Sequence, residues 1–227
     1  MNHARQAGFT LVEIAIVLVI IGLLLGGILK GQELVNNAKV RNVADQQSAI
    51  KAAYFAFQDR YKALPGDYVG ASTNIPNVVA LRSGDGNAQL SATEGVWAWH
   101  HLTQAGFISC APCATDPGAA PAASANNSPT NAYGGVMALI YDNVYNNAAL
   151  ATGNNINNLK SGNQVPSNIL AEVDRKIDDG NPRTGAFRFS TYAATGTAPG
   201  AATCAAITTD VWIVQTPDAN CGAANLF

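Results

Sequence analysis

The sequence predicts an α+β protein in which one long N-terminal helix, with a transmembrane half and an amphipathic half, packs against a small antiparallel sheet with short helices and long loops. Three observations support this prediction. Residues 9–29 are almost uninterruptedly apolar. Residues 43–64 carry apolar side chains at helical spacing. Beyond Pro65, short β-rich runs alternate with stretches rich in Gly, Ala and Asn.

Composition narrows the functional classes. The chain has 227 residues, of which 12% are charged, and a net charge of −2. This balance argues against a nucleic-acid-binding surface over the whole molecule. The four cysteines all lie beyond the apolar segment. An even number of cysteines on one side of a membrane is typical of an oxidising compartment.

The apolar segment is long enough to cross a bilayer, because about 20 apolar residues rising about 1.5 Å each span about 30 Å. Glu13 is its one ionisable side chain between Phe9 and Leu29. A carboxylate near the centre of a membrane helix costs roughly 2.5–3.5 kcal/mol, and less nearer the interface. Glu13 therefore needs a partner, and no Lys or Arg follows it within the apolar run.

The polar residues 1–8 precede this run, and the small residue Gly8 stands before the apolar core rather than after it. A cut after Gly8 would spare the core as an anchor and free an α-amine about one helical turn from Glu13. That amine could meet Glu13 of its own chain or of a neighbour. Arg5, with no acid beside it in this segment, favours a cytoplasmic N-terminus. Hydropathy alone leaves an uncleaved anchor equally open.

The tract Gly8-Phe9-Thr10-Leu11-Val12-Glu13, followed by an apolar run, resembles the leader and first mature residues of type IV prepilins and pseudopilins. The resemblance implies that a prepilin peptidase cuts between Gly8 and Phe9 and that Phe9 is then N-methylated. It also implies that Glu13 pairs with the N-terminus of a neighbouring subunit during assembly. The match is strong over residues 1–30 and loose beyond them.

The same resemblance implies a structural subunit of a type IV pilus or a type II secretion pseudopilus. We expect no enzymatic activity, since no catalytic motif is found, and no cofactor, with Ca²⁺ left open. The subunit would be stored in the bacterial inner membrane, with its N-terminus in the cytoplasm and its globular domain in the periplasm, before entering an extracellular pilus or a periplasmic pseudopilus. Its partners would be other pilin subunits, the prepilin peptidase, the assembly machinery and the inner membrane. The implied segments are a leader at 1–8, a transmembrane polymerisation helix at 9–30, its amphipathic continuation at 31–64 and an exported pilin-like domain at 65–227.

Two other classes of protein compete with this interpretation. A single-pass protein with an exported binding domain that never polymerises would gain nothing from an acid at Glu13. An exported enzyme would need a catalytic constellation. The three histidines, His3, His100 and His101, stand in no recognisable nucleophile or metal motif. Both alternatives rank below the filament subunit.

Lys30 is a departure from the family pattern. Many major pilins carry a proline at this place in the helix, whereas the first proline here is Pro65. Gly22, Gly26 and Gly27 would each weaken the helix by about 1 kcal/mol relative to Ala, or would permit close packing against other membrane helices. The missing proline leaves the branch of the family open.

Apolar residues beyond the membrane segment recur at spacings of three, four and seven, as expected for one face of a helix that ends before Pro65. Burial of this face against a globular domain is favoured over a free coiled coil, because the residues that follow need a core. The face consists of Val43, Ile50, Tyr54, Phe57, Tyr61 and Leu64.

Two polar segments could offer oxygen ligands to Ca²⁺. Asp85 and Asn87 stand in a Gly- and Asp-rich loop, and Asp178 and Asp179 follow a predicted helix. Neither segment completes an EF-hand pattern. Solvated turns are therefore favoured at both places.

The tract Cys110-Ala-Pro-Cys113 has three interpretations: a structural disulfide, a redox dithiol, or half of a zinc site completed by His100 and His101. The disulfide is favoured, because the chain has no second C-x-x-C and no thioredoxin-like strand pattern before this one.

The other two cysteines flank the last predicted strand. A bridge between Cys204 and Cys221 would close a loop and stabilise the folded state by roughly 3 kcal/mol in the chain-entropy model. Four cysteines allow three pairings. Proximity in sequence favours Cys110–Cys113 and Cys204–Cys221.

The remaining elements are short. Ser91 and Glu94 form a capping-box pattern before a helix that ends at Gly106, with Trp97 and Leu102 expected in the core. Another helix is expected to begin with Ser167 as its cap. Strands are expected at 135–141, 187–192 and 211–215, and loops at 69–90, 114–132 and 146–163.

Overall fold

The computed structural model describes residues 10–146, 153–206 and 208–227. The chain divides into two compact units, Met1–Lys39 and Val40–Phe227, which are described separately. The predicted cleavage residues Gly8 and Phe9 lie outside the described residues.

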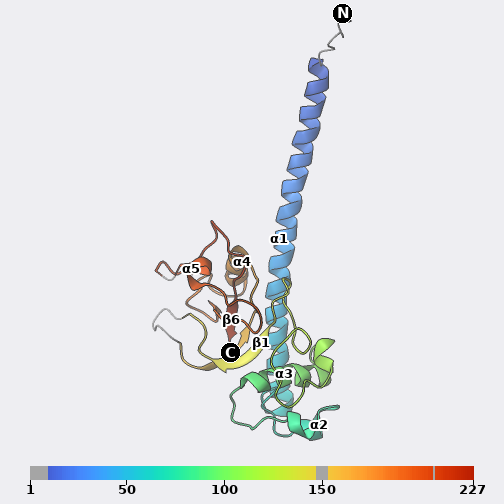
Figure 1. Cartoon of the computed structure of the whole chain (residues 1–227), viewed down its shortest axis with the longest axis vertical. Coiled ribbons are helices and arrows are strands. Elements are labelled where there is room, and N and C mark those ends of the chain that lie inside the picture. Colours follow the sequence, from blue (N-terminus) through green and yellow to red (C-terminus); the bar gives the residue numbers. More distant parts are fainter. Residues whose placement is uncertain (1–9, 147–152, 207) are drawn as a thin grey trace, which may run out of the picture. The chain divides into compact units, whose positions relative to one another are not determined.

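The first unit consists, where it is described, of the beginning of helix α1 (Leu11–Tyr61), drawn in blue in Figure 1. Every residue from Thr10 to Lys39 is exposed. The helix contains an 18-residue window with a mean hydropathy of 2.8, which makes it long and apolar enough to cross a membrane. The helix continues through Gly22, Gly26 and Gly27 without a break. The prediction of an apolar N-terminal helix is thus confirmed from Leu11 onward.

In the second unit, the rest of α1 buries most of the predicted apolar face, although Tyr61 is only partly buried and Leu64 lies beyond the end of the helix. Ile50, Tyr54 and Phe57 belong to one hydrophobic cluster, which also contains Trp99 and Leu102 of α3 (Ala92–Gln104). A second cluster lies nearer the start of this unit. It joins Val40, Val43 and Ala44 to apolar side chains of α4 (Ser167–Ile177), β3 (Phe187–Phe189) and β6 (Ala223–Leu226). The helix is therefore the common wall of both parts of the core.

The main sheet is antiparallel, with strand order β1-β2-β6-β3. Strand β1 (Ala138–Asp142) pairs with β2 (Ile156–Lys160), and β6 lies between β2 and β3. A second, two-stranded sheet pairs β4 (Ala205–Ala206) with β5 (Val211–Trp212). The short remaining helices are α2 (Ala71–Asn74), η1 (Ala80–Arg82), η2 (Pro112–Ala114) and α5 (Ala201–Cys204).

Helix α3 begins as predicted. The Ser91 hydroxyl accepts from the Glu94 N–H, and the Glu94 carboxylate accepts from the Ser91 N–H. Gly95 lets this helix approach β1 closely, because a Cβ at Gly95 would lie 1.9 Å from the carbonyl oxygen of Leu139. Trp99, rather than the predicted Trp97, is the fully buried tryptophan of α3.

Three expectations about the second unit are wrong. The stretch 69–90 is not only a loop, because α2 and η1 form within it. Ser167 does not cap α4, because Pro166 occupies the N-cap position and the Ser167 hydroxyl donates to the carbonyl of Ile213. The stretch 146–163 is not only a loop, since β2 forms within it. This strand escapes sequence inspection because two of its buried side chains, Asn158 and Lys160, are polar and donate hydrogen bonds to Asp142 of β1.

Candidate processing and assembly site

The described part of the predicted processing site begins at Thr10, which stands just before α1. The Thr10 backbone N–H and hydroxyl both donate to Oε2 of Glu13, at 2.7 and 2.9 Å. The Glu13 backbone N–H returns a bond to the Thr10 hydroxyl oxygen at 3.3 Å. This is a reciprocal capping box, with threonine at the N-cap and glutamate at N3. Sequence reasoning sought the partner of Glu13 in the α-amine freed by cleavage, on its own chain or on a neighbour, and overlooked Thr10.

The capping box explains how an acid is tolerated at the head of this apolar helix. The first turn of a helix exposes N–H groups without intrahelical partners, and its dipole favours a negative charge there. Among the described residues, both hydrogen bonds to the Glu13 carboxylate use Oε2. The structure therefore gives Oε1 no hydrogen-bond partner among the described residues, while Thr10 holds the side chain through Oε2.

Lys30 lies where the resemblance would place a proline. Its ammonium group forms an ion pair with Glu33 at 2.7 Å, and both side chains are more than half exposed. The backbone of α1 is helical on either side of this pair. In the absence of proline the helix thus passes from its apolar to its polar part without interruption.

The structure brings Asp85 near Asp67 and Glu94, with one ligand atom from each within 4.8 Å of the others. The Asp67 carboxylate already accepts backbone N–H bonds from Gly86, Asn87 and Ala88. Burial raises the pKa of Asp67, and the backbone hydrogen bonds oppose that rise. Asn87 donates to Asp85 and is not part of the three-residue group.

The second acidic group consists of Asp174, Asp178 and Asp179. Asp174 accepts from the indole N–H of Trp212 at 2.7 Å. Asp178 accepts from the backbone N–H groups of Ala186 and Phe187 at 2.5 and 2.7 Å. In both groups carboxylates already bind backbone or indole N–H groups. Calcium binding by Asp85 and Asn87, or by Asp178 and Asp179, stays a prediction that calcium titration would test.

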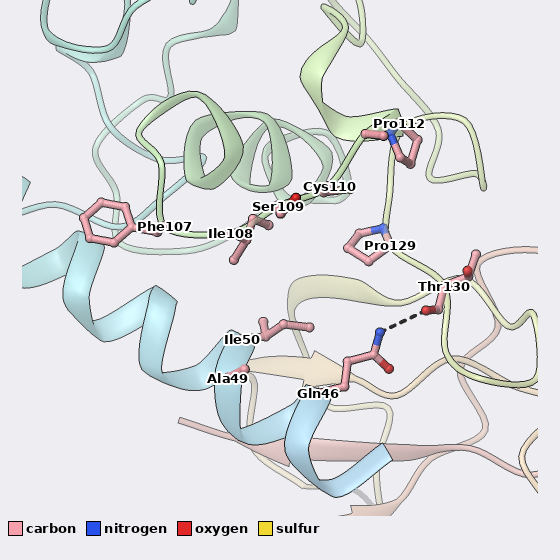
Figure 2. Close-up of a pocket in the computed structure, with 11 residues that line it drawn as sticks. Gln46, Ala49, Ile50, Phe107, Ile108, Ser109, Cys110, Pro112, Pro129 and Thr130 are labelled. Atoms are coloured by element: carbon pink, nitrogen blue, oxygen red, sulfur yellow. Dashed lines mark hydrogen bonds between the residues drawn. The ribbon is translucent and has the colours of Figure 1, made fainter. Parts of the chain in front are cut away.

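A groove of about 540 Å³ opens in the second unit beside the C-x-x-C tract. One wall is α1 at Gln46, Ala49 and Ile50, and the other is formed by residues 107–112 and 129–130 (Figure 2). The Gln46 side-chain amide donates to the carbonyl oxygen of Thr130 at 2.9 Å. Cys110 is one of the lining residues.

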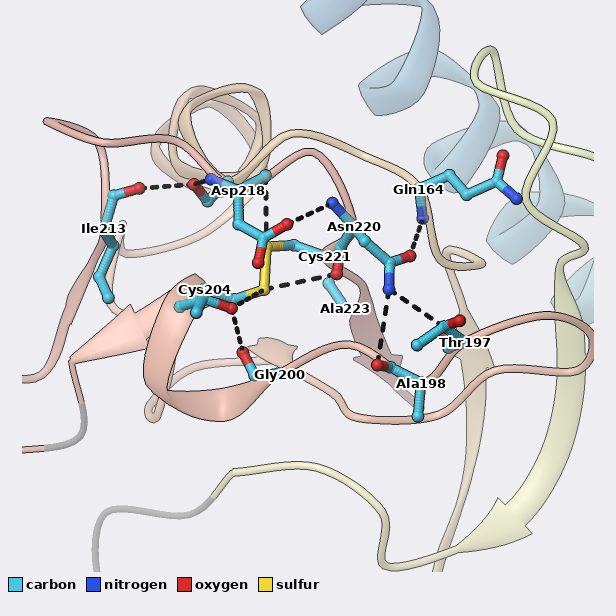
Figure 3. The surroundings of a disulfide bond; sticks show 12 residues. Gln164, Thr197, Ala198, Gly200, Cys204, Ile213, Asp218, Asn220, Cys221 and Ala223 are labelled. Atoms are coloured by element: carbon cyan, nitrogen blue, oxygen red, sulfur yellow. Dashed lines mark hydrogen bonds between the residues drawn. A yellow bond between two sulfur atoms is a disulfide. The ribbon is translucent and has the colours of Figure 1, made fainter.

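The structure joins Cys110 to Cys113 and Cys204 to Cys221, the pairs favoured by proximity. Figure 3 shows the second bridge, and the Asn220 N–H donates to Asp218 in the turn before Cys221. Because Cys110 and Cys113 are bonded to each other, neither supplies the thiolate that a zinc site needs.

The two histidines of α3 have structural partners. His101 accepts the Gly66 N–H at Nδ1, so its Nε2 carries the proton and donates to the carbonyl of Arg82. Burial lowers the pKa of His101 to about 4, which keeps this ring neutral. His100 contacts the carbonyl oxygen of Cys113 through Nδ1 at 2.9 Å.

Comparison with protein families gives one match: residues 3–29 fit the family described as prokaryotic N-terminal methylation motif. A search of the curated proteins and a search of the solved structures each found no match. Proteins with this motif are structural rather than enzymatic, and the motif implies processing by a prepilin peptidase and assembly into pilin filaments. The chain therefore carries the prepilin-type cleavage and methylation segment of type IV pilins and pseudopilins, on an α+β pilin-like fold.

Proposed function

We propose that this chain is a non-enzymatic structural subunit of a type IV pilus or of a type II secretion pseudopilus. It is stored in the inner membrane, cut after Gly8, methylated at Phe9 and assembled through α1. The observation that carries the proposal is the capped acid Glu13 at the head of an exposed apolar helix, inside the matched motif.

The proposed topology follows from charge and hydropathy. Arg5 keeps the leader in the cytoplasm, the apolar part of α1 crosses the membrane, and residues 65–227 fold in the periplasm. Cleavage exposes a new ammonium group on Phe9. During assembly this group lies at the same depth in the membrane as Glu13 of a neighbouring subunit. Charge pairing at this depth removes the cost of an isolated carboxylate. Lateral packing of the apolar helices then replaces lipid contacts with protein contacts.

Variants of Glu13 test the proposal and separate its two roles. Glu13→Gln keeps an acceptor for the capping box but removes the charge, whereas Glu13→Ala removes both. A charge-assisted hydrogen bond contributes roughly 1.5–3 kcal/mol, so we expect both variants to lower filament incorporation about tenfold or more. Incorporation is measured by immunoblotting sheared filaments against the membrane-stored pool.

Glu33→Gln is the matched control, because Glu33 is an acid of the same helix whose partner is the exposed Lys30. It should assemble like the wild type. Normal filaments from Glu13→Gln would show that assembly does not need the negative charge of Glu13. A chain that inserts, is never found in filaments and tolerates every Glu13 substitution would favour the alternative, a non-polymerising membrane protein with an exported binding domain.

A further inference from the structure

We propose that the Cys204–Cys221 disulfide is a one-way redox latch. It fixes strand β6 between β2 and β3 and is afterwards protected by the fold that it completes. The second unit therefore reaches its full fold only where a thiol oxidant is present. The proposal goes beyond a filament role and does not depend on it.

Strand β6 completes the main sheet from the inside. Among the described elements it is the last strand in the sequence, yet it is an inner strand of the sheet. It pairs with β2 on one side and with β3 on the other. Without β6, the sheet divides into the β1–β2 pair and a separate β3. The segments that precede β6 in the chain therefore cannot form the main sheet by themselves.

The side chains of β6 supply little hydrophobic burial to hold the strand in this position. Its buried residues are Ala223, Ala224 and Asn225, and Leu226 is only partly buried. Hydrophobic stabilisation scales with the apolar area that is removed from water, and an alanine methyl group offers far less area than the side chain of Val, Leu or Phe. An inner strand with such small side chains depends on other anchors.

The disulfide is the anchor at the start of β6. Cys221 lies two residues before the strand and exchanges two backbone hydrogen bonds with Val165, at 3.0 and 3.1 Å. Its partner Cys204 is the last residue of α5, and both cysteines belong to the second hydrophobic cluster (Figure 3). At the other end of the strand, Lys51 of α1 donates to the carbonyl of Leu226 at 2.9 Å. The bridge thus ties the start of β6 covalently to the core.

The completed latch is protected from reduction. Cys204 and Cys221 are both 0% exposed. A reducing thiolate must reach one of the two sulfur atoms, so it opens the bridge only in molecules whose fold has already opened locally. Before β6 is in place the same cysteines are accessible to an oxidant. The fold therefore permits the bridge to form and then prevents its loss.

Closure of the latch is an oxidation by thiol–disulfide exchange, and the oxidant is a disulfide of another molecule. The thiolate of one cysteine, Cys204 or Cys221, attacks this disulfide, forms a mixed disulfide and releases one thiol of the oxidant. The thiolate of the other cysteine then attacks the sulfur of the first and releases the second thiol. The two cysteines lose two electrons and two protons, and the oxidant gains both.

Two backbone amides report on whether β6 is in place. The Ser161 N–H donates to the carbonyl of Ala223 at 2.8 Å, and the Ser190 N–H donates to the carbonyl of Gly222 at 3.0 Å. Both amides lose their acceptors when the segment from Gly222 onward leaves the sheet. Their hydrogen exchange in the full-length chain in detergent therefore measures the opening of β6.

The double variant Cys204→Ser, Cys221→Ser removes the latch. We expect the two reporter amides to exchange about a hundredfold faster in this variant than in the wild type, because the bridge closes a loop with a sequence separation of 17. The matched control is Cys110→Ser, Cys113→Ser, which removes a bridge with a separation of 3 and should leave both amides at the wild-type rate. Wild-type exchange in the first variant, or equal acceleration in both, would overturn the proposal.

A second measurement needs no variant and decides the question even where the double variant does not fold. The reduced wild-type chain is refolded from urea into detergent with oxidised glutathione, refolding is stopped by alkylation, and the mixture is exposed briefly to deuterium. Mass spectrometry then resolves molecules with and without the Cys204–Cys221 bridge. We expect Ser161 and Ser190 to be protected only in molecules that contain the bridge. Protection of both amides in molecules without it would refute the latch.

The one-way property is tested on the oxidised wild type. Dithiothreitol followed by alkylation should leave Cys204 and Cys221 unlabelled in native buffer and should label both in urea, where the fold no longer covers the sulfur atoms. Peptide mass spectrometry identifies the labelled cysteines. Labelling at the same rate with and without urea would show that the fold does not protect the bridge and would overturn a one-way latch.

Discussion

Thr10 and Glu13 show what a short polar pattern does at the head of an apolar helix. The threonine supplies two donors and one acceptor, and the glutamate completes the box. A carboxylate so held is already aligned before any neighbouring subunit arrives. We infer that Thr10 is a positioning residue for Glu13, so that its effect on assembly is smaller than that of the acid itself.

Substituting Thr10 tests this inference. Thr10→Val removes the hydroxyl at nearly constant volume and should cost the first turn of α1 about 1 kcal/mol. Thr10→Ser keeps the cap and serves as the control. Amide hydrogen exchange in micelles should rise in the first turn of the valine variant alone, with a modest loss of filament incorporation. Identical exchange in the two variants would contradict the capping role.

Asp174 gives the second unit a specific pH dependence. The side chain is wholly buried, and burial raises its pKa from 3.8 to about 6, although Trp212 donates to it. The native state therefore holds this proton more tightly than the unfolded chain. The resulting stability is complete below about pH 3.8 and is lost as pH rises through about 6.

Asp174→Asn isolates this contribution. Between about pH 4 and about pH 7, the free energy of unfolding of the wild type relative to the variant should fall by roughly 2–3 kcal/mol. Urea denaturation at both pH values measures the difference. A wild-type-minus-variant difference that stays constant with pH would show that Asp174 does not titrate in this window.

At the scale of elements, sequence periodicity predicted α1 well because one face repeats over several turns. Val43, Ile50, Tyr54 and Phe57 are all buried as expected. The same reasoning missed β2, because burial of Lys160 depends on its ion pair with Asp142 at 2.8 Å, on a different strand. A polar residue that is buried by a distant partner looks like a loop residue in the sequence.

The candidate processing site also contains an interaction that sequence reasoning missed. Glu13 stood out because an acid in an apolar run is conspicuous. The Thr10–Glu13 box has the same spacing as the Ser91–Glu94 box that was predicted. The search for a positively charged partner hid the neutral local one, Thr10. The acidic groups could not be predicted from the sequence. Asp67 is far from Asp85 in the chain, and only folding brings the two carboxylates together.

Packing of α3 against β1 depends on Gly95. Gly95→Ala would place a methyl group 1.9 Å from the Leu139 carbonyl, and overpacking of this kind typically costs about 1–3 kcal/mol. Gly31→Ala is the control, since a Cβ there meets nothing within 4 Å. Thermal denaturation should show a lower melting temperature for Gly95→Ala alone. Equal melting temperatures would mean that α3 can shift away from the strand.

At the scale of the whole molecule, the two units have different chemistry. Residues 10–39 are exposed throughout and largely apolar, while the second unit, from Val40 onward, contains both hydrophobic clusters. The matched motif, residues 3–29, lies within the first unit. Composition and strand-like runs predicted the α+β architecture of the second unit, but not its exact strand pairing. This division suits a subunit whose first unit assembles and whose second unit coats a filament.

The most direct test of the filament account is the N-terminus of the mature chain. The protein is purified from cells with an active prepilin peptidase and from cells without one, and its terminal peptide is analysed by mass spectrometry. We predict a chain that begins at Phe9 with one added methyl group in the first cells and an uncut chain in the second. A chain that still begins at Met1 in the presence of the peptidase would contradict the central claim.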